Sequence, residues 1–175
     1  ALAPRTPASA IRKLLPGHFL VFENDSFKIK KYWEISAREG PWDQAEEEGR
    51  LRQLLAQSVR RRMISDVPLG AFLSGGIDSS ILVGLMSQCS NRPVKTFSIG
   101  FKNASYNELD YARIAARHFK TEHHEEIIDL DIFDSLPDFI YRQDEPMADV
   151  SIFPTFLVSQ VARKNVTVVL SGDGG

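Results

Sequence analysis

Short apolar runs alternate with amphipathic stretches over residues 66–175 of this chain. Runs typical of β-strands cover residues 70–73, 94–99, 123–128 and 166–170. Apolar residues three or four positions apart predict helices over about 79–88, 109–119, 132–140 and 153–163. Because strands alternate with helices and several strands lack a polar face, we expect an α/β domain with a doubly wound parallel sheet.

The first third of the chain has a different pattern. Residues 1–16 contain three prolines and little regular period, as in a surface segment. Residues 17–22 and 27–33 are strand-like, and the polar turn between them predicts a β-hairpin. A two-stranded hairpin is marginal alone, so we expect it to belong to a sheet supplied by something else. Residues 36–43 form a connector, and an apolar stripe predicts a helix over 44–62.

The sequence SGGIDSS at positions 74–80 lies between the strand 70–73 and the helix that follows it. Ser74, Gly75 and Gly76 can bring backbone N–H groups close to an anion. Ser79 and Ser80 add hydroxyl donors to the first helical turn, where unpaired N–H groups already favour phosphate. A carboxylate at position 78 would repel phosphate unless a cation lies between them. The stretch therefore predicts a pyrophosphate cradle in which Asp78 holds Mg²⁺.

Two common phosphate-binding motifs do not describe this loop. A Walker A loop requires four residues between its glycines and a lysine before the Ser/Thr, and a dinucleotide fingerprint requires G-x-G-x-x-G. The alternative of a simple glycine–serine helix cap does not call for two glycines, two serines and an acid together. SGGIDSS resembles instead the PP-loop of ATP pyrophosphatases, which cut ATP between its α and β phosphates.

Composition sets limits on the class of protein. The 175 residues carry a formal net charge of −2, which gives no bulk attraction to nucleic acid or to an anionic membrane. No apolar run is long enough to span a bilayer. The one cysteine, Cys89, continues an apolar helical spacing, which favours a buried core residue over a nucleophile. A single cysteine fits a reducing compartment, and we expect a cytoplasmic protein.

A second glycine-rich loop, residues 171–175, follows the strand 166–170. Ligands of parallel sheets lie beyond the carboxyl ends of the strands, so both glycine-rich loops should open at the same edge. Neighbouring residues on a strand point to opposite faces, so His123 and His124 are not expected to share a metal ion. Ser105 and Glu108 have the spacing of a capping box at the start of a helix.

The motifs together resemble the synthetase domain of glutamine-hydrolysing asparagine synthetases. The residues that carry this resemblance are 65–80, 96–101, 144–146 and 170–174, with Leu15-Pro16-Gly17-His18 and Tyr32-Trp33 near the start. The resemblance implies a PP-loop domain, similar to adenine nucleotide alpha hydrolases, that is truncated at its C-terminus. It assigns residues 1–35 to the tail of a glutaminase domain, 36–65 to a connector and helix, and 66–175 to the synthetase domain.

The family's reaction has two steps. Aspartate is adenylated by ATP with release of pyrophosphate, and ammonia derived from glutamine then converts aspartyl-AMP to asparagine. The glutaminase nucleophile of the family is an N-terminal cysteine, whereas position 1 here is alanine, so this chain alone is expected to be inactive. Further acids and lysines of the family's site are expected beyond Gly175. The resemblance implies ATP and Mg²⁺ as ligands and leaves a homodimer open.

The resemblance also implies roles for individual residues. Leu73 and Ile99 match positions whose backbone borders the nucleotide, and Ser171 and Gly172 match another nucleotide-contacting stretch. Asp173 stands where many members carry a glutamate proposed to act near the intermediate. Glu108 and Asp110 could face the site, but a cap or a solvated helix face explains them better. Asp144 and Glu145 are open to either a substrate-side or a structural role.

Other functions remain compatible with the same motifs. A different carboxylate-adenylating amidotransferase, such as a β-lactam synthetase, would share the nucleotide half and differ in the acceptor pocket. A tRNA-thiolating or sulfate-reducing PP-loop protein would show a basic face or catalytic cysteines, and the sequence has neither. A nucleotide-binding module without turnover would keep the cradle and lose catalysis.

Overall fold

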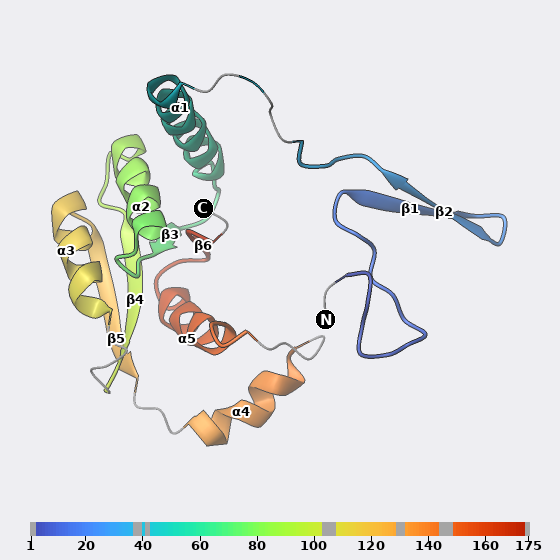
Figure 1. Cartoon of the computed structure of the whole chain (residues 1–175). Coiled ribbons are helices and arrows are strands. Elements are labelled where there is room, and N and C mark those ends of the chain that lie inside the picture. The colour runs from blue at the N-terminus through green and yellow to red at the C-terminus, as the bar shows by residue number, and fades with distance from the viewer. Residues whose placement is uncertain are drawn as a thin grey trace. The chain divides into compact units, whose positions relative to one another are not determined.

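The structure of the chain, a computed structural model, describes residues 3–36, 40, 43–102, 108–128, 132–143 and 149–173. Its helices and strands are labelled in Figure 1. The chain divides into two compact units, Ala1–Trp42 and Asp43–Gly175.

The first unit is built around an antiparallel hairpin of β1 (His18–Glu23) and β2 (Ser26–Lys31). Asn24 and Asp25 form its two-residue loop with φ values of 52° and 57°, the left-handed pair that a type I′ turn requires. The hairpin was predicted from the sequence, and it is present. Phe22 and Phe27 pair across the strands, yet they remain 66% and 65% exposed.

The second unit contains a four-stranded parallel sheet with the order β5-β4-β3-β6. Its strands are β3 (Leu69–Phe72), β4 (Lys95–Phe101), β5 (Glu122–Ile128) and β6 (Val168–Leu170). The predicted α/β fold with a parallel sheet is confirmed. The chain moves outward from β3 to β5 and then returns to place β6 on the other side of β3. The order therefore reverses at β3, where ligands of such sheets bind.

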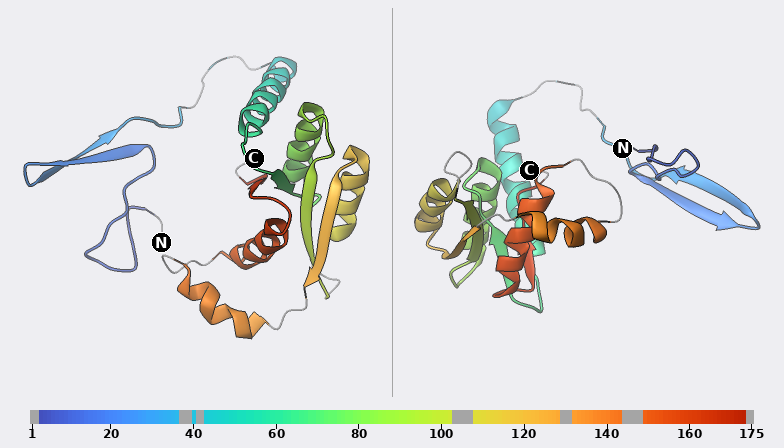
Figure 2. Two further views of the ribbon diagram at one scale, coloured as in Figure 1. Left: turned by 180° about the vertical axis from the view of Figure 1, so that it is seen from behind. Right: turned by 90° about the horizontal axis from the view of Figure 1, so that it is seen from below.

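Helices lie on both faces of this sheet, as Figures 1 and 2 show. The helices of the unit are α1 (Gln44–Arg62), α2 (Ile77–Cys89), α3 (Leu109–Phe119), α4 (Ile132–Tyr141) and α5 (Ile152–Arg163). Helices α1, α2 and α3 contribute to the core on one face, and α5 contributes to the core on the other. Phe139 of α4 packs on α5, with ring centroids 5.2 Å from Phe153 and 5.4 Å from Phe156.

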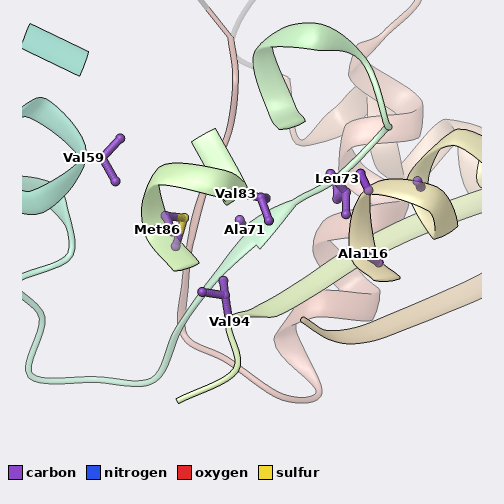
Figure 3. Close-up of a cluster of buried hydrophobic side chains, with 9 residues drawn as sticks. Val59, Ala71, Leu73, Val83, Met86, Val94 and Ala116 are labelled. Carbon is purple, nitrogen blue, oxygen red and sulfur yellow. The ribbon is translucent and has the colours of Figure 1, made fainter. Parts of the chain in front are cut away.

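The two cores follow from the alternation of side chains along the strands. Ala71 and Leu73 point to the α2 and α3 side, where Val83 and Met86 of α2 join them (Figure 3). Phe97, which is fully buried, points to the opposite side. There it packs with apolar residues of α5, and Phe72 and Ile99 of the sheet are packed against the same cluster. Burial of each such side chain contributes about 1.5–3 kcal/mol, which fixes the helices on the sheet.

Local signals explain the bounds of α1. The Asp43 carboxylate accepts a hydrogen bond from the Glu46 backbone N–H at 2.9 Å and so caps the first turn. Three arginines, residues 60–62, lie in the last turn, where cations complement the helix dipole. Only part of the predicted apolar stripe is buried: Val59 is buried, whereas Leu51 and Leu54 are more than half exposed.

Two expectations about other helices need correction. Helix α3 begins at Leu109 with Glu108 at its N-cap, so Glu108 does not occupy the third helical position that the capping box predicted. Its partner in that pattern, Ser105, lies outside the described residues. Cys89 is partly rather than fully buried, and its thiol is free. No helix in the described parts of the chain is long and apolar enough to cross a membrane.

Candidate functional site

A cavity of about 380 Å³ lies at the carboxyl ends of β3, β4 and β6. Its walls are residues 72–74, 76 and 78–79, residues 97–99 and 101, the starts of α3 and α5, and residues 171–173. Both glycine-rich loops therefore open at the same edge of the sheet, as predicted. The cavity also lies beside β3, where the strand order reverses.

The loop after β3 forms one wall through its serine hydroxyls. The Oγ atoms of Ser74 and Ser79 are 3.1 Å apart, and the Gly76 N–H donates to Ser74 Oγ at 3.2 Å. Ser79 Oγ in turn donates to the Gly76 carbonyl at 3.1 Å. These hydroxyls are held together at the N-terminus of α2, whose unpaired N–H groups and positive dipole end attract anions. The arrangement suits a bound phosphate group, whose oxygens could accept hydrogen bonds from these hydroxyls in place of the bonds within the loop.

Two predicted cradle residues, Gly75 and Ser80, support the loop on the side away from the cavity. Gly75 has φ of +83°, and a Cβ there would lie 2.4 Å from the carbonyl carbon of Tyr111 and 2.5 Å from the Ala112 nitrogen. The loop therefore rests directly on the first turns of α3. The Ser80 N–H donates to the Gly76 carbonyl at 3.0 Å as the helix begins. Neither Gly75 nor Ser80 lines the cavity.

Asp78 lies in the first turn of α2 and lines the cavity. Among the described residues, no group of three or more His, Cys, Asp or Glu is placed to hold a metal by itself. Mg²⁺ is commonly bound by one or two carboxylates together with substrate phosphates and water. One carboxylate beside an anion-binding helix end fits that mode.

The loop after β6 touches the start of α2. A Cβ on Gly172 would lie 2.9 Å from the Ser79 backbone nitrogen and 3.0 Å from the Asp78 carbonyl carbon. Ser171 Oγ donates to Asp173 Oδ2 at 2.6 Å and accepts from the Asp173 N–H at 3.1 Å. Ser171 thereby holds the Asp173 carboxylate, and all three residues line the cavity.

Leu73 and Ile99 line the cavity from the ends of β3 and β4. Their side chains belong to the two cores, with Leu73 only 1% exposed. The Leu73 N–H donates to the Phe97 carbonyl at 3.0 Å, and the Leu73 carbonyl accepts from Ser98 Oγ. The backbone of Leu73 is therefore tied to β4 by both its N–H and its carbonyl.

Sequence reasoning missed several residues of the cavity. Ser151 and Thr155 lie one turn apart at the start of α5, and Thr155 Oγ1 donates to the Ser151 carbonyl at 2.8 Å. Asp149 accepts from the backbone N–H and the hydroxyl of Ser151, and these hydrogen bonds hold the pKa of Asp149 below its usual value. Glu108 was considered as a cap and also lines the cavity. Asp144 and Glu145 lie outside the described residues.

The two histidines of β5 point apart, as predicted. The imidazole of His124 stacks on Phe97 at a centroid distance of 5.3 Å, on the α5 side of the sheet. His123 Nδ1 lies 2.9 Å from Thr96 Oγ1. Burial lowers the pKa of His123. Neither histidine lines the cavity.

Comparison with known proteins identifies related sequences. Residues 50–175 match the family model described as asparagine synthase. A Methanocaldococcus jannaschii protein provisionally named glutamine-hydrolyzing asparagine synthetase 2 is 46% identical over 162 residues, which cover 89% of this chain and 31% of that protein. Glutamine-hydrolyzing asparagine synthetase 1 of Bacillus subtilis is 32% identical over 173 residues, which cover 98% of this chain and 27% of that protein. The chain thus spans about a third or less of the length of these relatives.

A solved structure, the NH3-dependent NAD synthetase from Campylobacter jejuni, is similar at 18% sequence identity and a TM-score of 0.46. The likeness covers 69% of this chain and 54% of that chain.

Proposed function

The chain belongs to the asparagine synthase family, and from that membership we propose that it forms the nucleotide-binding part of an ATP-dependent ligase. The ligase joins ammonia to the side-chain carboxylate of aspartate. The observation that carries the proposal is the single cavity into which the loop after β3, the start of α2 and the loop after β6 all open.

Amide formation from a carboxylate requires activation, because an oxide ion is a poor leaving group. In the first proposed step, a carboxylate oxygen of aspartate attacks the α-phosphorus of ATP, and the bond to pyrophosphate breaks. In the second, ammonia attacks the acyl carbon of aspartyl-AMP, loses a proton and displaces AMP. Negative charge develops on the departing pyrophosphate, so donors that point there lower the barrier.

The residues proposed to cradle pyrophosphate are Ser74, Gly75, Gly76, Ser79 and Ser80, of which Ser74, Gly76 and Ser79 line the cavity. Ser74 and Ser79 line the cavity and are 3.1 Å apart at the N-terminus of α2, which supports their role most directly. The other residues shape the turn on which those hydroxyls lie.

We propose that Asp78 is a ligand of Mg²⁺, because one carboxylate together with substrate phosphates is enough to hold this ion. The ion would supply positive charge against the developing charge of pyrophosphate. Asp78 would hold the ion beside the cradle, because it lines the cavity from the first turn of α2, one residue before Ser79. We assign Asp173 to the neighbourhood of the reacting carboxylate, where Ser171 holds it by the hydrogen bond described above.

The source of ammonia is proposed to be glutamine, hydrolysed in a separate domain of the longer protein. Residues 1–35 would be the tail of that domain. The hairpin supports this assignment, because it forms a compact unit apart from the sheet and exposes many apolar side chains. The relatives described above carry the words glutamine-hydrolyzing in their names.

The proposal is tested by Asp78→Asn in the full-length protein, which removes the charge and keeps the size of the side chain. Aspartate-dependent exchange between ATP and labelled pyrophosphate should fall by about 100-fold or more. The matched control is Asp138→Asn on α4, an exposed acid that pairs with Arg142 and lies outside the cavity. Exchange that is retained in Asp78→Asn would remove Asp78 from the mechanism.

The identity of the acceptor needs a separate measurement. AMP release by the wild-type protein should depend on aspartate when a panel of carboxylates is offered together with ammonia. Release that depends on a different carboxylate would identify another adenylating amidotransferase. Binding of ATP in calorimetry without AMP release from any carboxylate would identify a nucleotide-binding module without turnover.

A further inference from the structure

The charged side chains that line the cavity are all acidic among the residues that the structure describes. Its lining includes the carboxylates of Asp78, Glu108 and Asp173, and none of the described residues that line it is lysine, arginine or histidine. The proposed function already uses Asp78 for the cation and Asp173 for the reacting centre. The proposed function assigns no role to the third acid, Glu108.

Glu108 is not explained by the helix on which it lies. It is the N-cap residue of α3, but its side chain makes no capping hydrogen bond to that helix. The arginine nearest along α3 is Arg113, which is already paired with Asp110 at 3.0 Å and Glu125 at 2.7 Å. Glu108 thus presents a carboxylate to the cavity that this arginine does not neutralise.

The position of Glu108 is tied to that of the phosphate loop. The backbone of Tyr111 and Ala112, in the first turns of α3, is in direct contact with Gly75. The Glu108 carbonyl accepts from the N–H groups of both residues, at 3.1 and 3.2 Å. The backbone of Glu108 is therefore held next to the phosphate loop, and its exposed side chain lies at the cavity wall beside the cradle.

An acidic lining repels a ligand that carries only negative charge. An acceptor that is a plain dicarboxylate would therefore meet repulsion at Glu108. An α-amino acid brings an ammonium group, which can form a charge-assisted hydrogen bond with a carboxylate. The Glu108 carboxylate thus favours acceptors with an ammonium group.

We propose that Glu108 binds the ammonium group of the amino-acid acceptor and makes this cavity select amino acids over carboxylates that lack the group. This inference rests on the proposed function, because it concerns the acceptor of the same reaction. Glu108 touches the acceptor in this proposal and takes no part in proton transfer.

The test uses the full-length protein with Glu108→Gln, and the readout is aspartate-dependent AMP formation. The KM for aspartate should rise about 2- to 5-fold, since an ion pair with an exposed carboxylate is lost. Succinate is aspartate without its amino group, so it serves as a competitive inhibitor that does not engage Glu108. Its inhibition constant should stay the same or fall, and the KM for ATP should not change.

Two further variants complete the test. Asp110→Asn alters an acid two residues away that is 84% exposed and outside the cavity, and it should leave all three constants unchanged. Glu108→Asp keeps the charge and should restore part of the preference for aspartate.

Either of two results would overturn the inference: an unchanged KM for aspartate in Glu108→Gln, or an equal weakening of aspartate and succinate. A wild-type protein that forms no AMP with aspartate would instead refute the proposed function on which the inference rests.

Discussion

Gly75 and Gly172 exclude a side chain for different physical reasons. Gly75 has a positive φ, and its Cα faces the backbone of α3, which cannot move without shifting the helix. Gly172 needs no unusual φ and is instead pressed against the backbone of Ser79. The first glycine sets the shape of the phosphate loop, and the second lets the two loops of the cavity meet.

Replacing Gly75 by alanine should destabilise the fold. A left-handed φ costs an alanine about 1–2 kcal/mol, and displacement of the Tyr111 backbone adds to that cost. We expect the free energy of unfolding in urea to fall by about 1–3 kcal/mol. The control is Gly49→Ala, because Gly49 lies inside α1 with open space around its Cα, and this change should stabilise by about 0.5–1 kcal/mol. A Gly75→Ala protein as stable as the wild type would contradict the proposed contact with α3.

Individual residues could be predicted from the sequence where their role depends only on their type and on their neighbours in the chain. Ser74, Gly76 and Ser79 were predicted because glycine and hydroxyl residues at the start of a helix have an evident use for an anion. Glu108 was interpreted as a cap because an acid near a helix start has an ordinary explanation. Its place at the cavity depends on how α3 packs on the phosphate loop, which no local pattern encodes.

At the scale of elements, apolar periodicity was enough to predict helix α1 with its observed bounds. The structure adds the local cause of those bounds, because Asp43 caps the first turn and arginines lie in the last turn. Helix α4 continues to Tyr141 although Pro137 lies inside it. After the proline, Phe139 is buried against Phe153 and Phe156, and this packing compensates for the lost backbone hydrogen bond.

The junction between β4 and β5 should make stability depend on pH. His123 has a lowered pKa because burial disfavours its charged form, and its Nδ1 is bonded to buried Thr96. Below pH 6.5 the unfolded chain binds a proton at this ring that the folded chain does not bind. The free energy of unfolding should therefore decrease as the pH falls below 6.5, and the decrease should end once the folded protein is protonated too.

The variant His123→Asn removes this titration and keeps a polar group near Thr96. Urea unfolding at pH 7.5 and pH 5.5 should show that the stability difference between wild type and His123→Asn is larger at pH 7.5. A difference that is the same at both pH values would mean that His123 is not protonated more easily in the unfolded chain.

At the scale of the whole molecule, the sheet and its ligand edge could be predicted, whereas the complete wall of the cavity could not. Alternating strands and helices require parallel pairing, and loops that follow parallel strands open at one edge. The contribution of Ser151 and Thr155 depends on how α5 crosses the sheet. That crossing is set by the packing of Val158 and Val161 on Phe97, a long-range contact that periodicity alone does not specify.

The hairpin of the first unit leads to a prediction about the longer protein. Phe22, Phe27 and Trp33 are each more than half exposed, and a hairpin of two strands is marginal in water. If residues 1–35 complete a sheet of a glutaminase domain, the backbone N–H groups of β1 and β2 should be protected from hydrogen exchange in the full-length protein. In the 175-residue chain the same groups should exchange much faster, while those of β3 and β4 stay protected in both. Equal exchange of β1 and β2 in the two proteins would show that no further domain covers the hairpin, and the assignment of residues 1–35 would then be wrong.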